Sequence, residues 1–122
     1  MPIPNDYRDI CEMLLEATKK GLVNWIEEAG TFEVRLPEYN FEIWSGTDEL
    51  GQRSFVAVGL KDPSERRGLL DSWYVEEGDK DYDLIFALFG EARRKARRLP
   101  EKLDSLRNLL KSGSTIGEIE KS

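Results

Sequence analysis

The chain has 122 residues, 39% of them hydrophobic, and a formal net charge of −6. This length and apolar content suit one globular domain with one core, and the negative charge disfavours binding to nucleic acid and to anionic membranes. The sequence contains no histidine and a single cysteine, Cys11, which excludes His-based catalytic triads and zinc sites of the Cys/His kind. Since no other catalytic constellation is recognisable, we expect no catalytic site, no metal site and no cofactor.

The first predicted element is an amphipathic helix over residues 5–20, which Asn5 or Asp6 is placed to cap and Gly21 ends. Its apolar residues recur at spacings of three and four: Tyr7, Ile10, Cys11, Leu14 and Ala17. Because Cys11 lies on this apolar side, we interpret it as a small buried hydrophobe, with a reactive thiol as the alternative.

The central part of the chain has the pattern of a β-meander. Short runs rich in β-branched and aromatic residues alternate with Gly, Pro, Asn and Asp. The predicted strands cover residues 22–27, 31–36, 40–45, 53–61 and 68–75.

Helical spacing returns after Gly78, and Pro100 begins a shorter, leucine-rich helix that Gly113 ends. The order predicts an α+β fold with an N-terminal helix, an antiparallel meander of four to five strands, and two C-terminal helices packed on one sheet face. We expect one domain over residues 1–113 and a polar, flexible tail over residues 114–122.

No apolar run approaches the roughly 20 residues that cross a bilayer. The first residues also lack the basic and apolar parts of a secretory signal. We therefore expect a cytoplasmic protein without a membrane partner.

Trp44 is the aromatic residue that most suggests a functional surface. If Phe41 and Ile43 face a core covered by helices, Trp44 faces the opposite side of the sheet. Three further apolar residues join it there if Phe55 and Ala57 point inward: Val56, Val58 and Leu60. An apolar patch of this kind is typical of a homodimer interface or a site for a small apolar ligand, unless another part of the chain covers it.

Two charged segments have structural and functional interpretations. Five cations lie where the long C-terminal helix is predicted to end: Arg93, Arg94, Lys95, Arg97 and Arg98. We interpret them as cations that complement the helix dipole. The alternatives are a binding site for an acidic protein partner and one for nucleic acid, and we expect no binding to nucleic acid.

The acidic segment 79–83 is spaced like the start of a calcium loop, but Leu84 and Gly90 replace the required glycine and glutamate. We interpret that segment as a helix N-terminal cap.

Asp71 lies inside an apolar strand, between Leu70 and Ser72-Trp73. We predict that it is a half-buried structural acid that accepts hydrogen bonds and joins its strand to the following helix.

The second half of the chain carries a resemblance. The relevant residues are Leu70-Asp71-Ser72-Trp73, Asp81-Tyr82 with Leu84 and Leu88, and Ala92-Arg93-Arg94-Lys95-Ala96 with the leucine-rich helix that follows. They resemble a family of small uncharacterised bacterial proteins that combine a β-meander with an "ARRKA" helix. The resemblance implies a bacterial, cytoplasmic α+β domain, and because the family has no established activity it implies no functional residues.

These features predict a non-enzymatic protein-interaction module that forms a homodimer through the apolar sheet face around Trp44. The alternative is a small-molecule-binding domain that uses this face or a pocket between the sheet and the helices. A third and less favoured interpretation is a carboxylate-based hydrolase, which requires paired acids with displaced pKa values in a cleft.

Overall fold

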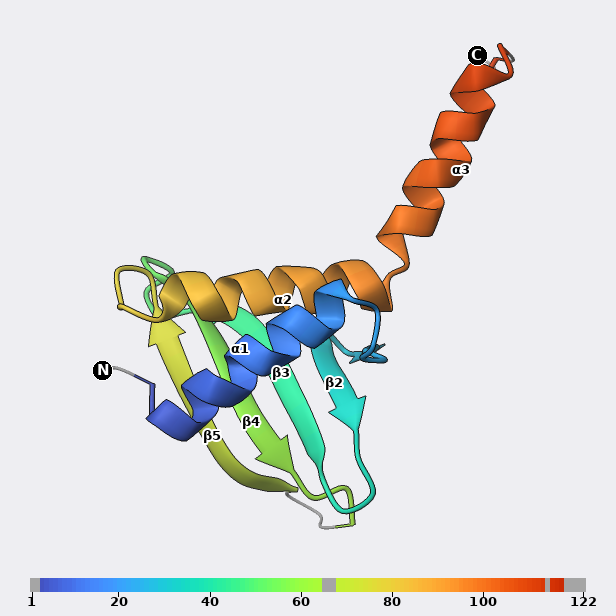
Figure 1. Ribbon diagram of the computed structural model, residues 1–122. Helices are drawn as coiled ribbons and strands as arrows, with labels where there is room; N and C mark the ends of the chain where they lie inside the picture. Colours follow the sequence, from blue (N-terminus) through green and yellow to red (C-terminus); the bar gives the residue numbers. More distant parts are fainter. Residues whose placement is uncertain (1–2, 65–67, 114, 118–122) are drawn as a thin grey trace.

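The computed structural model describes residues 3–64, 68–113 and 115–117 (Figure 1). It confirms the α+β fold with one helix before the sheet and two after it. The elements in chain order are α1 (Asn5–Lys19), β1 (Ile26–Glu28), β2 (Thr31–Arg35), β3 (Asn40–Thr47), β4 (Ser54–Lys61), β5 (Leu69–Glu76), α2 (Tyr82–Ala96) and α3 (Leu99–Lys111).

The five strands form one antiparallel sheet in the order β1-β2-β3-β4-β5. The first strand is shorter than the predicted run over residues 22–27 and begins further along the chain. The reason is Trp25, which is buried in the core and donates its indole N–H to Thr18 Oγ1 at 2.9 Å, so the chain reaches the sheet only after it. Ala29 and Gly30, with φ of 51° and 82°, then form the turn between β1 and β2. Two successive positive φ angles are typical of the mirror-image turn that joins twisted strands.

Helices α1 and α2 lie on the same face of the sheet and enclose the core with it (Figure 1). Phe32, Ile43 and Val58 from the sheet meet Ile85 and Leu88 from α2, and all five are almost completely buried. Cys11 is also fully buried, and burial, with a smaller contribution from Glu12, raises its pKa to about 12. The interpretation of this cysteine as a buried hydrophobe is therefore confirmed.

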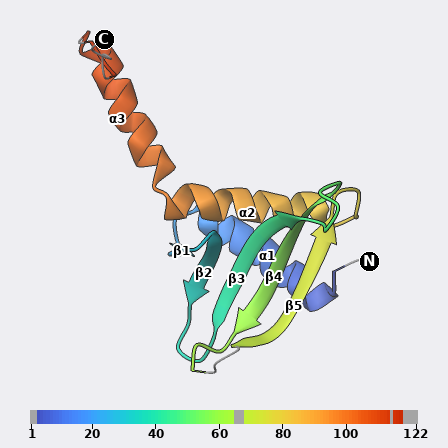
Figure 2. The same cartoon turned by 180° about the vertical axis from the view of Figure 1, so that it is seen from behind.

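Helix α3 does not pack on the sheet, so the predicted position of the last helix is wrong. It extends away from the body of the protein in both views of the chain (Figures 1 and 2). None of its 13 residues is buried. The physical reason is Arg98, which has φ of 55° and turns the chain sharply at the end of α2. Of the predicted tail, residues 114 and 118–122 lie outside the described residues.

Within the described ranges, no helix has the length and apolar character needed to cross a membrane.

Candidate functional site: an exposed helix, an aromatic groove and a pocket

The strand register assigns each apolar residue of β4 to a face. Directly paired residues share a face of the sheet, and Val58 pairs with Ile43 while Leu60 pairs with Phe41. Val56 and Val58 are almost completely buried in the core, and Leu60 packs against it. The prediction that Val56, Val58 and Leu60 share a face with Trp44 is therefore wrong. Period-two alternation allows either assignment in a strand that is apolar on both sides, and the helices cover the side with the branched residues.

The opposite face of the sheet is uncovered by any described element (Figure 2). It carries Trp44, as expected, together with Phe55 and Tyr74, which line a groove of about 380 Å³. Phe55 and Tyr74 meet edge to face with ring centroids 6.1 Å apart, and the Phe55 ring lies directly against Gly46 on the neighbouring strand. We call this surface the aromatic groove. Three acids also line it: Asp48, Glu49 and Glu76.

Helix α3 exposes one apolar side. Leu103 is 49% exposed, Leu106 43% and Leu110 60%, and helical geometry places them on the same side as Leu99. Lys102 and Arg107 flank this row of leucines, which we call the leucine side. Glu101, Asp104 and Asn108 lie on the other side of the helix.

The basic cluster at the end of α2 has mixed roles. Arg97 donates two hydrogen bonds to Glu27 of β1, at 2.9 and 2.8 Å, and lowers the pKa of that carboxyl. Arg93 lies over the Phe89 ring at 5.6 Å. Arg93, Arg94 and Lys95 occupy the last turn of α2, as expected for cations that complement a helix C-terminus. Arg98 forms the junction with α3.

Asp81, and not Asp71, is the buried structural acid. Asp71 is exposed, so the prediction that it is half buried is wrong. The prediction that it joins its strand to the following helix, α2, is also wrong, because its hydrogen bond is with α1, where the Tyr7 hydroxyl donates to it at 2.8 Å. Asp81 is 5% exposed and accepts hydrogen bonds from Arg8 Nε at 3.0 Å, Arg8 Nη2 at 2.9 Å and the Ile3 N–H at 3.2 Å. The Arg8 guanidinium holds the pKa of Asp81 below its usual range, although burial opposes this. Asp81 stands at the N-cap position of α2 but makes no side-chain cap, because its carboxylate joins α2 to α1 instead.

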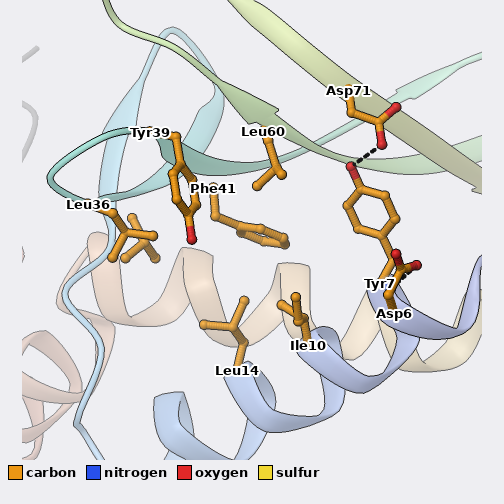
Figure 3. A pocket seen from close by; sticks show the side chains of 10 residues that line it. Asp6, Tyr7, Ile10, Leu14, Leu36, Tyr39, Phe41, Leu60 and Asp71 are labelled. Atoms are coloured by element: carbon orange, nitrogen blue, oxygen red, sulfur yellow. Dashed lines mark hydrogen bonds between the residues drawn. The ribbon is translucent and has the colours of Figure 1, made fainter.

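A second concave surface lies between α1 and the sheet (Figure 3). It measures about 270 Å³, and we call it the α1–sheet pocket. Figure 3 shows Asp71, Tyr7 and Asp6 at one end, and Leu36 and Tyr39 at the other. The remaining walls are apolar and come from α1, β2, β3 and β4: Ile10, Leu14, Val34, Phe41 and Leu60.

Glu33 and Glu42 form a carboxylate pair that the sequence did not reveal. They pair directly across β2 and β3 on the uncovered face, and both are nearly buried. Burial raises the pKa of Glu42, and Glu33 raises it further, while Lys61 at 3.8 Å lowers it. Arg35 Nε donates to Glu33 Oε1 at 2.8 Å. The pair meets the requirement of a hydrolase for adjacent acids with a displaced pKa, but it lines neither the aromatic groove nor the α1–sheet pocket.

Among the described residues, no group of three or more Cys, Asp or Glu side chains is arranged to hold a metal ion. Asp79 and Asp81 of the acidic segment both serve the protein itself, since Asp79 accepts the Glu76 N–H at 2.8 Å.

Comparisons of the chain with protein-family models, with curated proteins and with solved structures found no match in any of the three. The resemblance to small bacterial proteins with an "ARRKA" helix stays a prediction, and the function rests on the surfaces described above.

Proposed function

We propose that the protein is an interaction module that self-associates as a homodimer, with α3 of each copy packed in the aromatic groove of the other. The observation that carries this proposal is the exposed leucine side of α3. An isolated helix of about 13 residues is only marginally stable in water, so α3 needs a surface that covers its leucines. A contiguous exposed apolar surface of this kind usually marks an interaction site.

Charge favours the groove as the surface that receives α3. Helix α3 carries three basic and two acidic side chains, and the residues just before it, 93–98, carry five basic ones, whereas residues 1–92 carry nine basic and twenty acidic ones. Pairing of α3 with α3 brings Lys102 and Arg107 of both copies to the same seam, and like charges at a helix interface repel. The residues that line the aromatic groove include three acids and no basic residue, and one of these acids, Glu76, also forms an ion pair with Arg53 at 3.9 Å.

Shape separates the aromatic groove from the α1–sheet pocket as the receiving surface. A helix with its side chains is about 10–12 Å across and needs an open surface. The uncovered sheet face is such a surface, while the pocket is confined between α1 and the sheet. The exchange is reciprocal, so each dimer contains the α3–groove contact twice, as expected for two-fold symmetry.

The test is the oligomeric state of variants that place a charge on each side of the contact. Light scattering at micromolar concentration should give a dimer for the wild type and folded monomers for Leu106→Lys and Trp44→Lys. Asn108→Lys on the opposite side of α3, and Asn24→Lys at an exposed position before β1, add the same charge elsewhere and should remain dimeric.

Mixing the two monomeric variants sharpens the test. Trp44→Lys retains an intact α3 and Leu106→Lys an intact groove, so the mixture should form heterodimers through one remaining contact. Dimer affinity should also fall as salt is raised, because the contact joins opposite charges. A wild type that stays monomeric at its highest attainable concentration contradicts self-association. A dimeric Trp44→Lys beside a monomeric Leu106→Lys contradicts the groove and indicates α3–α3 pairing.

A further inference from the structure

The α1–sheet pocket has the features of a small-molecule site. Its walls are mainly apolar, and both of its carboxylates lie at one end, while Tyr39 lies at the other (Figure 3). Small-molecule sites generally combine an apolar lining with a few convergent polar groups. The pocket is separate from the aromatic groove and lies on the other face of the sheet, so it does not depend on the proposed dimer.

The polar end of the pocket is negative. Asp6 from α1 and Asp71 from β5 line it, and none of the ten lining residues is basic. Tyr7 lies between these two acids, and its hydroxyl donates to Asp71 Oδ2 at 2.8 Å. This bond joins Asp71 of β5 to α1 at the negative end of the pocket. Burial and the hydrogen bond to Asp71 raise the pKa of Tyr7, so the phenol remains a neutral donor.

The volume limits the size of a ligand. An engineered apolar cavity of about 150 Å³ holds a benzene molecule. A pocket of about 270 Å³ therefore has room for one ring or a branched aliphatic group with a short polar extension. A fatty acid or another organic anion would place its charge beside Asp6 or Asp71, which is unfavourable.

From this geometry we propose that the α1–sheet pocket binds a small organic cation, namely a protonated primary amine attached to one aromatic or branched aliphatic group. The apolar group packs among Ile10, Leu14 and Leu60, and the ammonium group lies at the Asp6–Asp71 end. There it donates hydrogen bonds to carboxylate oxygens, which are stronger than bonds between neutral groups.

The experiment compares three probes of similar shape on the full-length wild type: phenethylammonium, phenethyl alcohol and phenylpropanoate. Calorimetry and amide chemical shifts should show that phenethylammonium binds with a Kd on the order of 1 mM or lower. The shifts should be centred on residues that line the pocket. The alcohol should bind roughly tenfold more weakly, and the anion should not bind measurably.

Two variants separate the charge from the hydrogen bond. Asp71→Asn removes the charge and should weaken phenethylammonium binding roughly tenfold. Tyr7→Phe removes the hydrogen bond but retains the carboxylate, so binding should change by less than about threefold. Asp83→Asn, at an exposed position in the first turn of α2, makes the same chemical change elsewhere and should bind as the wild type does.

Absence of binding to the wild type overturns the proposal, and so does equal binding of the cation and the anion. Amide shifts confined to residues outside the pocket also overturn it. Because these measurements on the wild type need no substitution, a variant that fails to fold does not weaken the test. The dimer is monitored independently through Leu106→Lys, so failure of one proposal is distinguishable from failure of the other.

Discussion

Helices α2 and α3 follow one another in the chain and have similar apolar spacing, yet their apolar sides end in opposite environments. In α2 the apolar side is buried, with Ile85, Leu88 and Ala92 fully inaccessible to solvent. In α3 no residue is buried. The comparison shows that helical periodicity predicts a side that needs a partner but does not say whether that partner belongs to the same chain. The contrast between the acidic residues 1–92 and the basic segment 93–111, which includes α3, favours a second copy.

Core truncation should produce the largest difference between the two helices. Leu88→Ala removes a fully buried side chain and should lower the free energy of unfolding by about 3 kcal/mol. Leu106→Ala should change it by less than about 0.5 kcal/mol when measured below the concentration at which dimers form. Urea denaturation at two protein concentrations checks both values, because dimer formation adds stability only at the higher one. Equal losses at the lower concentration would mean that α3 packs on its own body.

Removal of an ion pair should produce the second largest difference in stability between the two regions. Asp81 accepts from Arg8 at 2.9 Å in a nearly buried site, while Asp104 of α3 accepts from Arg107 at 2.8 Å with both side chains exposed. Asp81→Asn should cost about 2 kcal/mol at neutral pH, because it leaves Arg8 and the Ile3 N–H with a weaker acceptor. Asp104→Asn should cost less than about 0.5 kcal/mol.

The pH dependence of the Asp81 effect has a definite sign. The pKa of Asp81 is lowered in the folded protein, so the carboxylate stabilises the fold above the unfolded value of 3.8 and loses this contribution as the pH falls through the folded value. The difference between the wild type and Asp81→Asn should therefore be full at neutral pH and shrink in acid. A difference that persists unchanged below about pH 3 would contradict the ionic origin.

The smallest expected effect is a gain in stability. Burial and Glu33 raise the pKa of Glu42, so the charged carboxylate destabilises the fold once the pH exceeds the unfolded value of 4.5. Glu42→Gln should raise the free energy of unfolding by about 1 kcal/mol at neutral pH, and the gain should disappear as the pH falls below that unfolded value. Glu101→Gln on exposed α3 is the matched control and should be neutral. Thermal denaturation at several pH values checks the pair, and a loss of stability in Glu42→Gln would indicate that Lys61 outweighs burial.

Much of the secondary structure is readable from local chemistry. The three helices follow from apolar spacing with Gly21, Pro100 and Gly113 as boundaries, and four strands lie close to their predicted ranges. Trp44 was also assigned correctly to the side of the sheet opposite Phe41 and Ile43, because neighbouring residues of a strand alternate. These features depend only on backbone geometry and on residues near one another in the chain.

The candidate sites depend on contacts between distant residues, and there the sequence was a poorer guide. Asp71 lies in an apolar strand and Asp81 in an acidic segment of the sequence, yet it is Asp81 that meets a cation, and that cation is Arg8, 73 positions away. The pairing of Glu33 with Glu42 and the position of Tyr7 beside Asp71 likewise required the sheet register and the placement of α1.

The sequence by itself therefore determined the order of elements, the apolar side of each helix and the charge contrast between residues 1–92 and residues 93–111, because these follow from residue type and period. Only the tertiary structure decided which face of β4 is buried, which acid is structural and where α3 points. Val56 and Val58 face the helices because the core is formed on that side, and α3 leaves the body because Arg98 adopts a positive φ. Both outcomes are set by packing and chain direction, which are properties of the whole fold and not of a local pattern.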